Sequence, residues 1–415
     1  MRILEGRKRD GLVRELEERG ANDLVEVEPV ARRIVNDVRK NGDRALRRYA
    51  EKRDGLGKNE AVRVSEDEMR EAWGKISVEL QRAITQAAEN IRRYCEWQKP
   101  QEWRREIQPG VCVGQLVRPL ESVGCYVPGG RYPLPSTLLM TVIPAQVAGV
   151  KEIRVTSPHP ASATLAAAAF LGVREFYRVG GAQAVAAMAY GTESVARVRK
   201  IVGPGNRYVT AAKKLVAFDC AIEFLAGPTE AVFISESGDP VFITCDMVAQ
   251  AEHDPDTLCI FIACSRDLAK SVQKEVQRRV RGNPIAGKSL SGRGAILLVA
   301  SLEEAVEVAN RIAPEHLTLP AALVPAVRNA GSIFLNEFTP QSAGDYISGP
   351  NHVLPTGAMA RVRGGLSVLD FVRIISCQEA SREGIRRIAS AAIALAEAEG
   401  LRGHAEALRV RCPHA

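Results

Sequence analysis

Apolar residues recur every three or four positions through the first hundred residues of the chain. The pattern is clearest in two stretches, residues 28–54 and 77–100, where charged residues fill the intervening positions. This spacing is typical of amphipathic helices. It predicts that residues 1 to about 100 are mainly helical.

The pattern changes near residue 111, where glycine turns begin to separate short apolar runs from helical stretches. The apolar run 122–127 meets Pro128-Gly129-Gly130, and a helix is expected over 136–150 with Ser136 as its N-cap. Similar units of strand, glycine turn and helix follow at 152–171, 175–191, 200–216 and 221–236. Their repetition predicts a mostly parallel α/β sheet with helices on both faces.

The same alternation resumes in the second half of the chain. Helices are expected over 241–252, 266–281 and 301–314, and strands over 258–265, 294–300 and 331–338. Two α/β sheets with one chain crossing between them explain this order better than one continuous sheet. Beyond Ser367 the pattern is nearly all helical, which predicts an arm that has no sheet of its own and packs elsewhere.

Length and composition are those of a soluble globular protein. The chain has 415 residues, of which 46% are hydrophobic and 25% charged, enough for two domains with appendages. No apolar run is long enough to span a membrane, and the first residues do not resemble a secretory signal. We therefore expect a cytoplasmic protein without a membrane partner.

The cysteines and the net charge exclude two classes of protein. Nine cysteines are scattered without a CxxC pair, which argues against a disulfide scaffold and a thiolate zinc site. The net charge is +7, but lysine and arginine alternate with glutamate and only 5% of residues are aromatic. Nucleic-acid binding usually requires clustered basic residues with interleaved aromatics, so no nucleic-acid partner is expected.

Six histidines occur, and four of them lie near other polar residues that could form a site. His159 and His414 lie in a proline-bounded loop and at the end of the sequence, and are expected to be bystanders. Gln250 and His253 are three apart on an expected helix, a spacing that can supply two metal ligands. The alternative is an exposed polar helix face, and on spacing alone this is the stronger interpretation.

The remaining polar pairs also allow two interpretations. Glu315 and His316 follow an expected helix that Pro314 ends, in a loop where they form either an acid–base pair or an ordinary helix end. Asp345 and His352 lie in a loop rich in glycine and proline, and Glu399 and His404 flank a break in the arm. No GxGxxG opens any unit, so the usual dinucleotide fingerprint is absent.

Seven short motifs, taken together, decide between these interpretations. In order they are GCYVPGGRYPLPS, VGGAQAVAAMAYG, VGPGNRYVTAAKKLV, AGPTE, QAEHDPD, APEHL and SAGDYISGPNHVLPTG. Together they resemble the histidinol dehydrogenase family, over about residues 20 to 408. Seven spaced motifs are far more specific than any single one, so the resemblance favours function at each of these sites.

The resemblance implies a division into two incomplete Rossmann-like domains, a short N-terminal helical segment (1–19) and a C-terminal helical arm (367–415). The first domain would comprise 20–125 and 230–366 and carry the zinc and catalytic residues. Residues 126–229 would form the second, NAD-binding domain. In the family the arm reaches a second subunit, so we expect an intertwined homodimer with an active site shared between its subunits.

The resemblance also implies roles for individual residues. The family's zinc ligands match Gln250, His253, Asp345 and His404, and its acid–base pair matches Glu315 and His316. Its other substrate contacts match Thr229, His352 and Glu399, and its NAD contacts match Tyr126, Gln183 and Asn206. One Zn²⁺ per subunit and NAD are therefore the expected cofactors. The chain has Glu223 where the family usually has Asp, and Thr229 where Ser is commoner and the hydroxyl is kept.

The activity implied is the four-electron oxidation of L-histidinol to L-histidine through bound L-histidinaldehyde, the last step of histidine biosynthesis. His316 would accept a proton in both oxidations, Glu315 would activate the water that adds to the aldehyde, and Glu399 would face the substrate ammonium. A related enzyme for another small alcohol, such as a sulfonated propanediol, would keep the zinc ligands but lack His352 or Glu399. Both residues are present.

Overall fold

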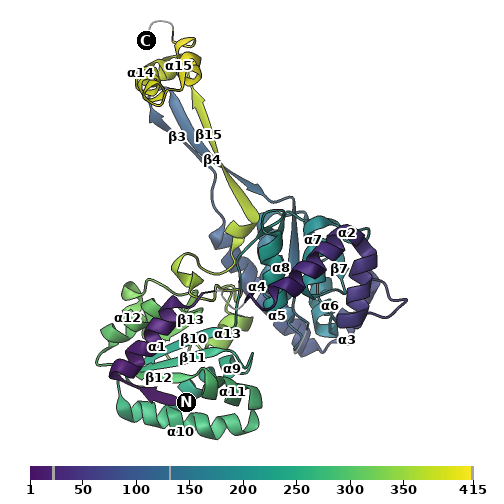
Figure 1. The fold of residues 1–415 in the computed structure, drawn as a ribbon, viewed down its shortest axis with the longest axis vertical. Helices are drawn as coiled ribbons and strands as arrows, with labels where there is room; N and C mark the ends of the chain where they lie inside the picture. Colours follow the sequence, from purple (N-terminus) through teal and green to yellow (C-terminus); the bar gives the residue numbers. More distant parts are fainter. Residues whose placement is uncertain (21–23, 130–131, 413–415) are drawn as a thin grey trace.

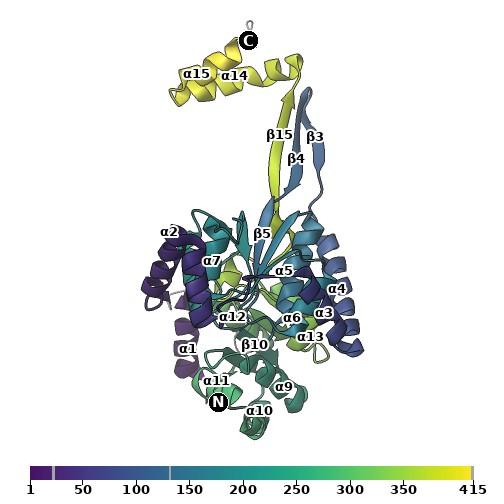
Figure 2. The same cartoon turned by 90° about the vertical axis from the view of Figure 1, so that its right-hand side faces the viewer.

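The computed structural model describes residues 1–20, 24–129 and 132–412, so His414 lies outside the described residues. The predicted α/β fold is confirmed: in these ranges the strands form two six-stranded sheets and one three-stranded sheet. Figures 1 and 2 show two α/β units at the base of the molecule and a slender arm that rises from them. None of the described helices is long and apolar enough to cross a membrane.

Sheet A combines the amino terminus of the chain with its second half. Its strands lie in the order β1-β12-β11-β10-β13-β14, and all neighbours run parallel. They are β1 (Arg2–Leu4), β10 (Glu230–Ser235), β11 (Leu258–Ala263), β12 (Ala295–Leu298), β13 (His316–Leu319) and β14 (Ser332–Leu335). β11 is buried along its whole length, as expected for a parallel strand covered on both faces.

Helices cover both faces of sheet A. α1 (Gly6–Glu18) and α12 (Leu302–Ile312) pack on one face, and α9 (Pro240–Ala251), α10 (Arg266–Arg279) and α11 (Pro284–Gly292) pack on the other. The short α13 (Gln341–Tyr346) follows β14 and contacts α9. The expected helical segment 1–19 is therefore a strand followed by a helix; three strand residues are too few to show a periodic pattern.

Sheet B has the strand order β2-β7-β6-β5-β8-β9, with only the β2–β7 pair antiparallel among the described residues. The strands are β2 (Arg63–Val64), β5 (Ser122–Tyr126), β6 (Glu152–Thr156), β7 (Glu175–Tyr177), β8 (Lys200–Val202) and β9 (Ala221–Ile222). α3 (Glu66–Lys75), α4 (Val78–Gln98), α5 (Pro135–Ala148) and α6 (Ser162–Phe170) form one hydrophobic core with the sheet. α2 (Glu28–Arg53), α7 (Gly181–Tyr190) and α8 (Arg207–Val216) form the other.

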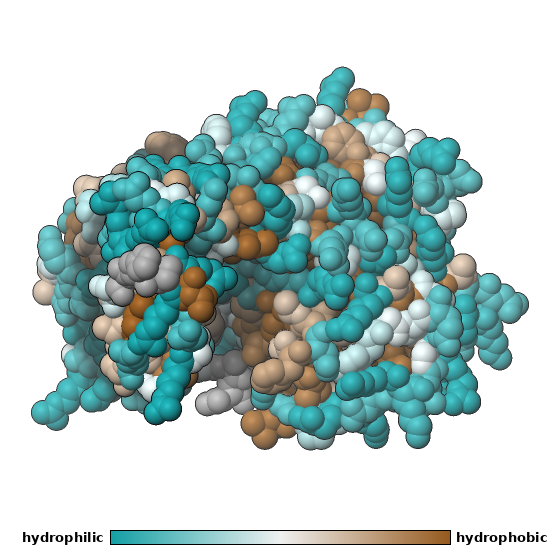
Figure 3. All heavy atoms as spheres, turned by 90° about the horizontal axis from the view of Figure 1, so that it is seen from above, coloured by the Kyte–Doolittle hydropathy of each residue, from teal (hydrophilic) through white to brown (hydrophobic). Residues whose placement is uncertain are grey.

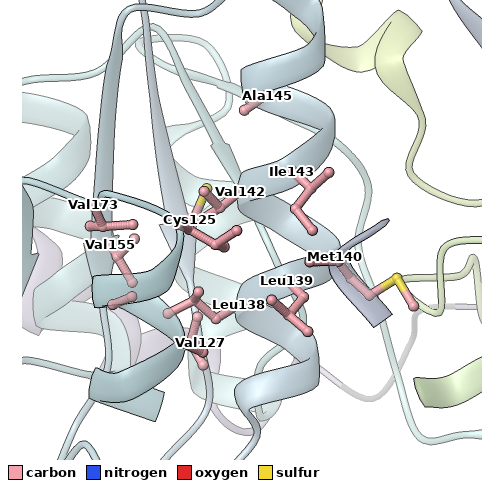
Figure 4. Packing of buried hydrophobic residues seen from close by; sticks show 14 of the residues in the cluster. Cys125, Val127, Leu138, Leu139, Met140, Val142, Ile143, Ala145, Val155 and Val173 are labelled. Carbon is pink, nitrogen blue, oxygen red and sulfur yellow. The ribbon is translucent and has the colours of Figure 1, made fainter. Parts of the chain in front are cut away.

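α5 is buried around its whole circumference. Figure 4 shows Leu138 and Val142 beside Val127 and Cys125, whereas Met140 points from the opposite side of the helix. A helix that is apolar on all sides is expected only where it packs on both sides. Ser136 is not the N-cap as predicted: the cap position is Leu134, and Pro135 opens the helix with Ser136 in its first turn.

The strand pairings divide the chain differently from the expected domains. The expected boundary between residues 125 and 126 falls inside β5, and α2, α3 and α4 pack on sheet B, although 20–125 was assigned to the other domain. An amphipathic pattern shows which face of a helix is buried. It does not show which sheet buries that face.

The arm is not wholly helical, which corrects the prediction for 367–415. β15 (Val372–Ala380) pairs antiparallel with β4 (Val111–Pro119), and β4 pairs with β3 (Trp103–Gln108). α14 (Arg382–Ala398) and α15 (Arg402–Arg409) lie at the far end of this ribbon (Figures 1 and 2). Most residues of β3 and β15 are exposed on both faces, so the alternation that identifies a half-buried strand is absent.

Short 3₁₀ helices complete the described secondary structure, at Val280–Gly282, Ala321–Ala326, Met359–Arg361 and Val368–Phe371. The nine cysteines all lie in described ranges and are free thiols, which agrees with the prediction that the fold has no disulfide scaffold. Seen along the arm, the surface is largely hydrophilic with scattered hydrophobic patches (Figure 3).

Candidate active site

Glu315 and His316 lie at the amino end of β13. α12 ends at Ile312, Ala313 takes a left-handed conformation (φ 51°), and after Pro314 the chain enters sheet A. His316 pairs with Ala231 of β10 and Ser332 of β14. The predicted loop position is therefore wrong for His316, because a strand of four residues that begins two residues after a proline gives too little pattern to identify.

The imidazole of His316 lies between two carboxylates. Its Nδ1 is 3.7 Å from Oε2 of Glu315, and its Nε2 is 3.5 Å from Oδ1 of Asp345. Burial lowers the pKa of His316, but these carboxylates raise it by more, so the net shift is upward. The ring stacks on Phe334, with centroids 5.8 Å apart. Neither ring nitrogen makes a hydrogen bond to a described residue. The stacking therefore orients the imidazole, and its nitrogens are available to accept a proton.

Glu315 is also buried, with 9% of its side chain exposed. Burial raises the pKa of Glu315 to about 8, although the adjacent His316 acts in the opposite direction. Oε2 accepts a hydrogen bond of 3.0 Å from the backbone N–H of Glu230, at the start of β10. A carboxyl group whose pKa lies near neutrality is suited to proton transfer with a substrate or water.

Asp345 and Gln250 come together from different helices. Nε2 of Gln250, in the last turn of α9, donates to Oδ2 of Asp345 on α13 at 3.0 Å. Oε1 of Gln250 is buried and accepts no hydrogen bond from a described residue. His253 follows the end of α9, where its N–H donates to the carbonyl of Gln250 at 3.3 Å, and its charge contributes to lowering the pKa of Asp345.

Three of the four expected zinc ligands therefore share one neighbourhood. Gln250 and His253 do not share a helical face as predicted, because α9 ends at Ala251. Across the described ranges, no group of three or more His, Cys, Asp or Glu side chains could hold a metal ion. The neighbourhood instead combines one amide, one carboxylate and one imidazole.

His352 links the two α/β units. Its Nδ1 is 2.7 Å from the carbonyl of Asp345, and its Nε2 is 3.2 Å from Oγ1 of Thr137 in the first turn of α5. A carbonyl can only accept, so Nδ1 carries the hydrogen and the Thr137 hydroxyl donates to Nε2. Burial lowers the pKa of His352, which favours this neutral form. Sequence reasoning missed Thr137, because a single hydroxyl in the first turn of a mainly apolar helix gives no signal.

The three predicted NAD contacts lie at the carboxyl edge of sheet B. Tyr126 ends β5, Gln183 lies in the first turn of α7, and Asn206 caps α8 by accepting from the N–H groups of Tyr208 and Val209. The strand order reverses between β5 and β8. Ligands of open α/β sheets bind at such a switch point, outside the carboxyl ends of the strands.

The other predicted residues are more scattered. Thr229 directly precedes β10 and is half-buried. It adjoins Glu230 in the chain, and the backbone N–H of Glu230 donates to Glu315 of the acid–base pair. Glu399 and His404 are exposed on the arm, at the end of the ribbon that is remote from sheet A (Figures 1 and 2). Within one chain the structure does not bring these two residues to the cluster.

The two parallel sheets and the buried acid–base cluster define the class of the protein, an α/β enzyme. A family model described as histidinol dehydrogenase matches residues 17–412. A histidinol dehydrogenase of Methanothermobacter thermautotrophicus is 46% identical over 414 residues, with 96% of each chain covered, and that of Aquifex aeolicus is 45% identical with 99% covered. The crystal structure of histidinol dehydrogenase from Elizabethkingia anophelis superposes with a TM-score of 0.94 at 34% identity, covering 99% of this chain and 98% of that one. The chain belongs to the histidinol dehydrogenase family and is an oxidoreductase.

Proposed function

We propose that the chain oxidises L-histidinol to L-histidine with NAD, by two successive hydride removals from the same carbon, as the last step of histidine biosynthesis in the cytoplasm. The observation that carries the proposal is the buried cluster of Glu315, His316 and Asp345 in a member of this family. An alcohol-to-acid oxidation needs a proton acceptor in both steps and an activated water in the second. The cluster supplies two groups of different basicity for these tasks.

His316 is the proton acceptor of the proposal. Its nitrogens lie more than 3.4 Å from both carboxylates, which leaves the imidazole open to a bound hydroxyl group. The Asp345 carboxylate, and Glu315 when it is ionised, stabilise the imidazolium that forms when the hydroxyl proton is taken. After the first oxidation His316 must lose that proton before it can act again.

Glu315 activates the water that adds to the bound aldehyde. With its pKa raised to about 8, Glu315 in its ionised form is more basic than an exposed glutamate and can take a proton from water. The hydrogen bond from Glu230 holds Oε2, which leaves Oε1 to the water. Retention of the aldehyde at a buried site keeps this reactive intermediate from escaping.

The residues present fit a zinc ion. Oε1 of Gln250 is a buried acceptor that receives no hydrogen bond from the described part of the chain, and the Asp345 carboxylate lies beside this amide, so the two oxygens and His253 would hold the metal. Oxygen and imidazole ligands both suit zinc. Bound zinc would orient histidinol through its imidazole and amine nitrogens.

The fourth ligand, His404, would come from the arm of a second chain, as would Glu399 for the substrate ammonium. The arm projects from the body and exposes apolar side chains along its length, including Ile107 (67% exposed), Ile374 (53%) and Leu395 (67%). An apolar surface of this kind is expected to pack against a partner. An isologous homodimer would bury it and complete both sites.

The direct test of the activity is the number of NADH molecules formed per L-histidinol. The proposal predicts two, with L-histidine as the product and no free aldehyde. One NADH per substrate with release of the aldehyde, or turnover of another small alcohol in preference to histidinol, would contradict it.

A further inference from the structure

A buried carboxylate that the proposed mechanism does not use contacts the glycine turn before α7. Asp54 follows α2 and is 7% exposed. Its Oδ2 accepts from the backbone N–H of Gly180 and from Nε2 of Gln183, each at 2.9 Å. The next amide, Gly181 N–H, donates to the hydroxyl of Tyr126 at 3.0 Å. Oxygens of the protein therefore occupy the amides of Gly180, the cap residue of this helix, and of Gly181, its first residue.

This arrangement is unfavourable for phosphate. A helix amino end binds a phosphate group through free N–H groups and the positive end of the helix dipole. Here the amides of Gly180 and Gly181 already have acceptors, and the Asp54 carboxylate places a negative charge at the same point. Burial raises the pKa of Asp54, whereas the hydrogen bonds from Gly180 and Gln183 favour its charged form.

Asp54 also fixes the orientation of the Gln183 side chain. The carboxylate can only accept, so Nε2 of the amide faces Asp54 and Oε1 faces away. Gln183 is 1% exposed, and its Oε1 receives no hydrogen bond within the described ranges. A Cβ atom on Gly181 would lie 2.8 Å from this oxygen, so glycine leaves the space beside it free. A buried acceptor without a donor is unfavourable, and a ligand donor would relieve that cost.

We propose that this turn binds a neutral hydrogen-bond donor of the dinucleotide, an O–H or N–H group, through Oε1 of Gln183, and that Asp54 is the positioning residue that orients the amide and excludes phosphate. The inference rests on the proposed function, because it takes NAD as the ligand. Three parts of NAD supply such a donor: the ribose hydroxyls, the carboxamide of the nicotinamide and the exocyclic amine of the adenine. The phosphates of NAD are anionic at neutral pH and have no proton to donate.

Equilibrium binding of NAD to the full-length chain and three variants tests the role of the charge. Asp54→Asn keeps an oxygen that can accept both hydrogen bonds and removes only the charge, so NAD affinity should stay within about threefold of wild type. Asp54→Ala removes the acceptor that orients the Gln183 amide, and Gln183→Met removes the oxygen that accepts from NAD. Each variant should bind NAD about fivefold more weakly than wild type, or weaker still. If phosphate lay at this turn, Asp54→Asn would remove a like charge and tighten NAD binding several-fold, which would overturn the inference.

Three kinds of NAD analogue identify the donor without relying on any Asp54 variant. The 3-acetylpyridine analogue lacks the carboxamide N–H, and the purine analogue lacks the adenine amine. The 2′-deoxyribose and 3′-deoxyribose analogues each lack one hydroxyl. Wild type should bind the analogue that lacks the group donating to Gln183 about fivefold more weakly than it binds NAD. The Gln183→Met variant should bind that analogue and NAD with equal affinity. Equal binding of NAD and all analogues by wild type would overturn the inference. If wild type binds no NAD at all, the proposed function fails and the inference with it; tighter binding by Asp54→Asn overturns the inference alone.

Discussion

Nε2 of His316 lies 3.5 Å from Oδ1 of Asp345, on the side of the ring away from Glu315. The same carboxylate accepts from Gln250 through Oδ2. The proposed proton acceptor is therefore in direct contact with a proposed metal ligand. This contact fixes the imidazole relative to the place where zinc would hold the substrate, so orientation and proton transfer depend on one another.

The acid–base pair should divide its work between the two oxidations. His316→Ala is expected to slow both by about 100-fold or more, because each oxidation releases a proton to that imidazole. Glu315→Gln should slow mainly the second, which alone needs an activated water. Single-turnover rates measured from histidinol and from histidinaldehyde separate the two. Equal losses in both halves for Glu315→Gln would contradict this division.

The raised pKa of Glu315 predicts how stability changes with pH. The folded protein holds the proton of Glu315 up to about pH 8, whereas the unfolded chain releases it near 4.5, so the unfolded state binds fewer protons between these values. Stability contributed at this site is therefore lost as the pH rises from about 4.5 to 8. In metal-free protein, Glu315→Gln should gain up to a few kcal/mol over wild type by pH 8 and little at pH 5. Denaturant unfolding at both pH values measures this, and a constant difference would contradict the burial argument.

Chelation should abolish activity without unfolding the protein, because sheets A and B have hydrophobic cores of their own. His253→Ala should lose zinc in elemental analysis while it keeps its melting temperature. His159→Ala provides the matched control, since His159 is an exposed histidine in a loop of the other unit. Full zinc occupancy in His253→Ala would remove His253 from the ligand set.

Thr137 should orient His352 for the substrate. Thr137→Val keeps the shape of the side chain and removes the hydroxyl that donates to Nε2 of His352. The KM for histidinol should then rise about threefold to tenfold, with a smaller change in kcat. Thr137→Ser restores the hydroxyl and should restore KM. A KM unchanged in Thr137→Val would show that the bond does not position His352.

Long elements with a clear apolar pattern could be predicted from the sequence, whereas contacts between distant segments could not. The buried run of β11 and the helical period of α12 gave strong signals. β13 has four residues, and the strands β3 and β15 of the arm are mainly exposed, so neither β13 nor these two strands showed a usable period.

The candidate site was predicted through the motifs and not through spacing. Glu315 and His316 are adjacent in the chain, but Asp345 reaches them only because α13 folds back over the amino end of β13. The high pKa of Glu315 depends on burial, which no local pattern reports. Asp54 orients Gln183, and Thr137 orients His352, through a hydrogen bond to a residue on another element. A single sequence carries no sign of such a pair.

Mixed dimers of two inactive variants test most directly whether a histidinol-oxidising site is completed by the arm of a second chain. A His404→Ala chain keeps an intact main site and lacks a functional arm. A His316→Ala chain lacks a functional main site and keeps an intact arm. After co-refolding, half of the dimers are mixed and each has one intact site. NADH formation from L-histidinol should therefore return to roughly a quarter of the wild-type rate. No recovery, with mixed dimers confirmed by mass, would contradict the account and show that His404 acts within its own chain or outside the site.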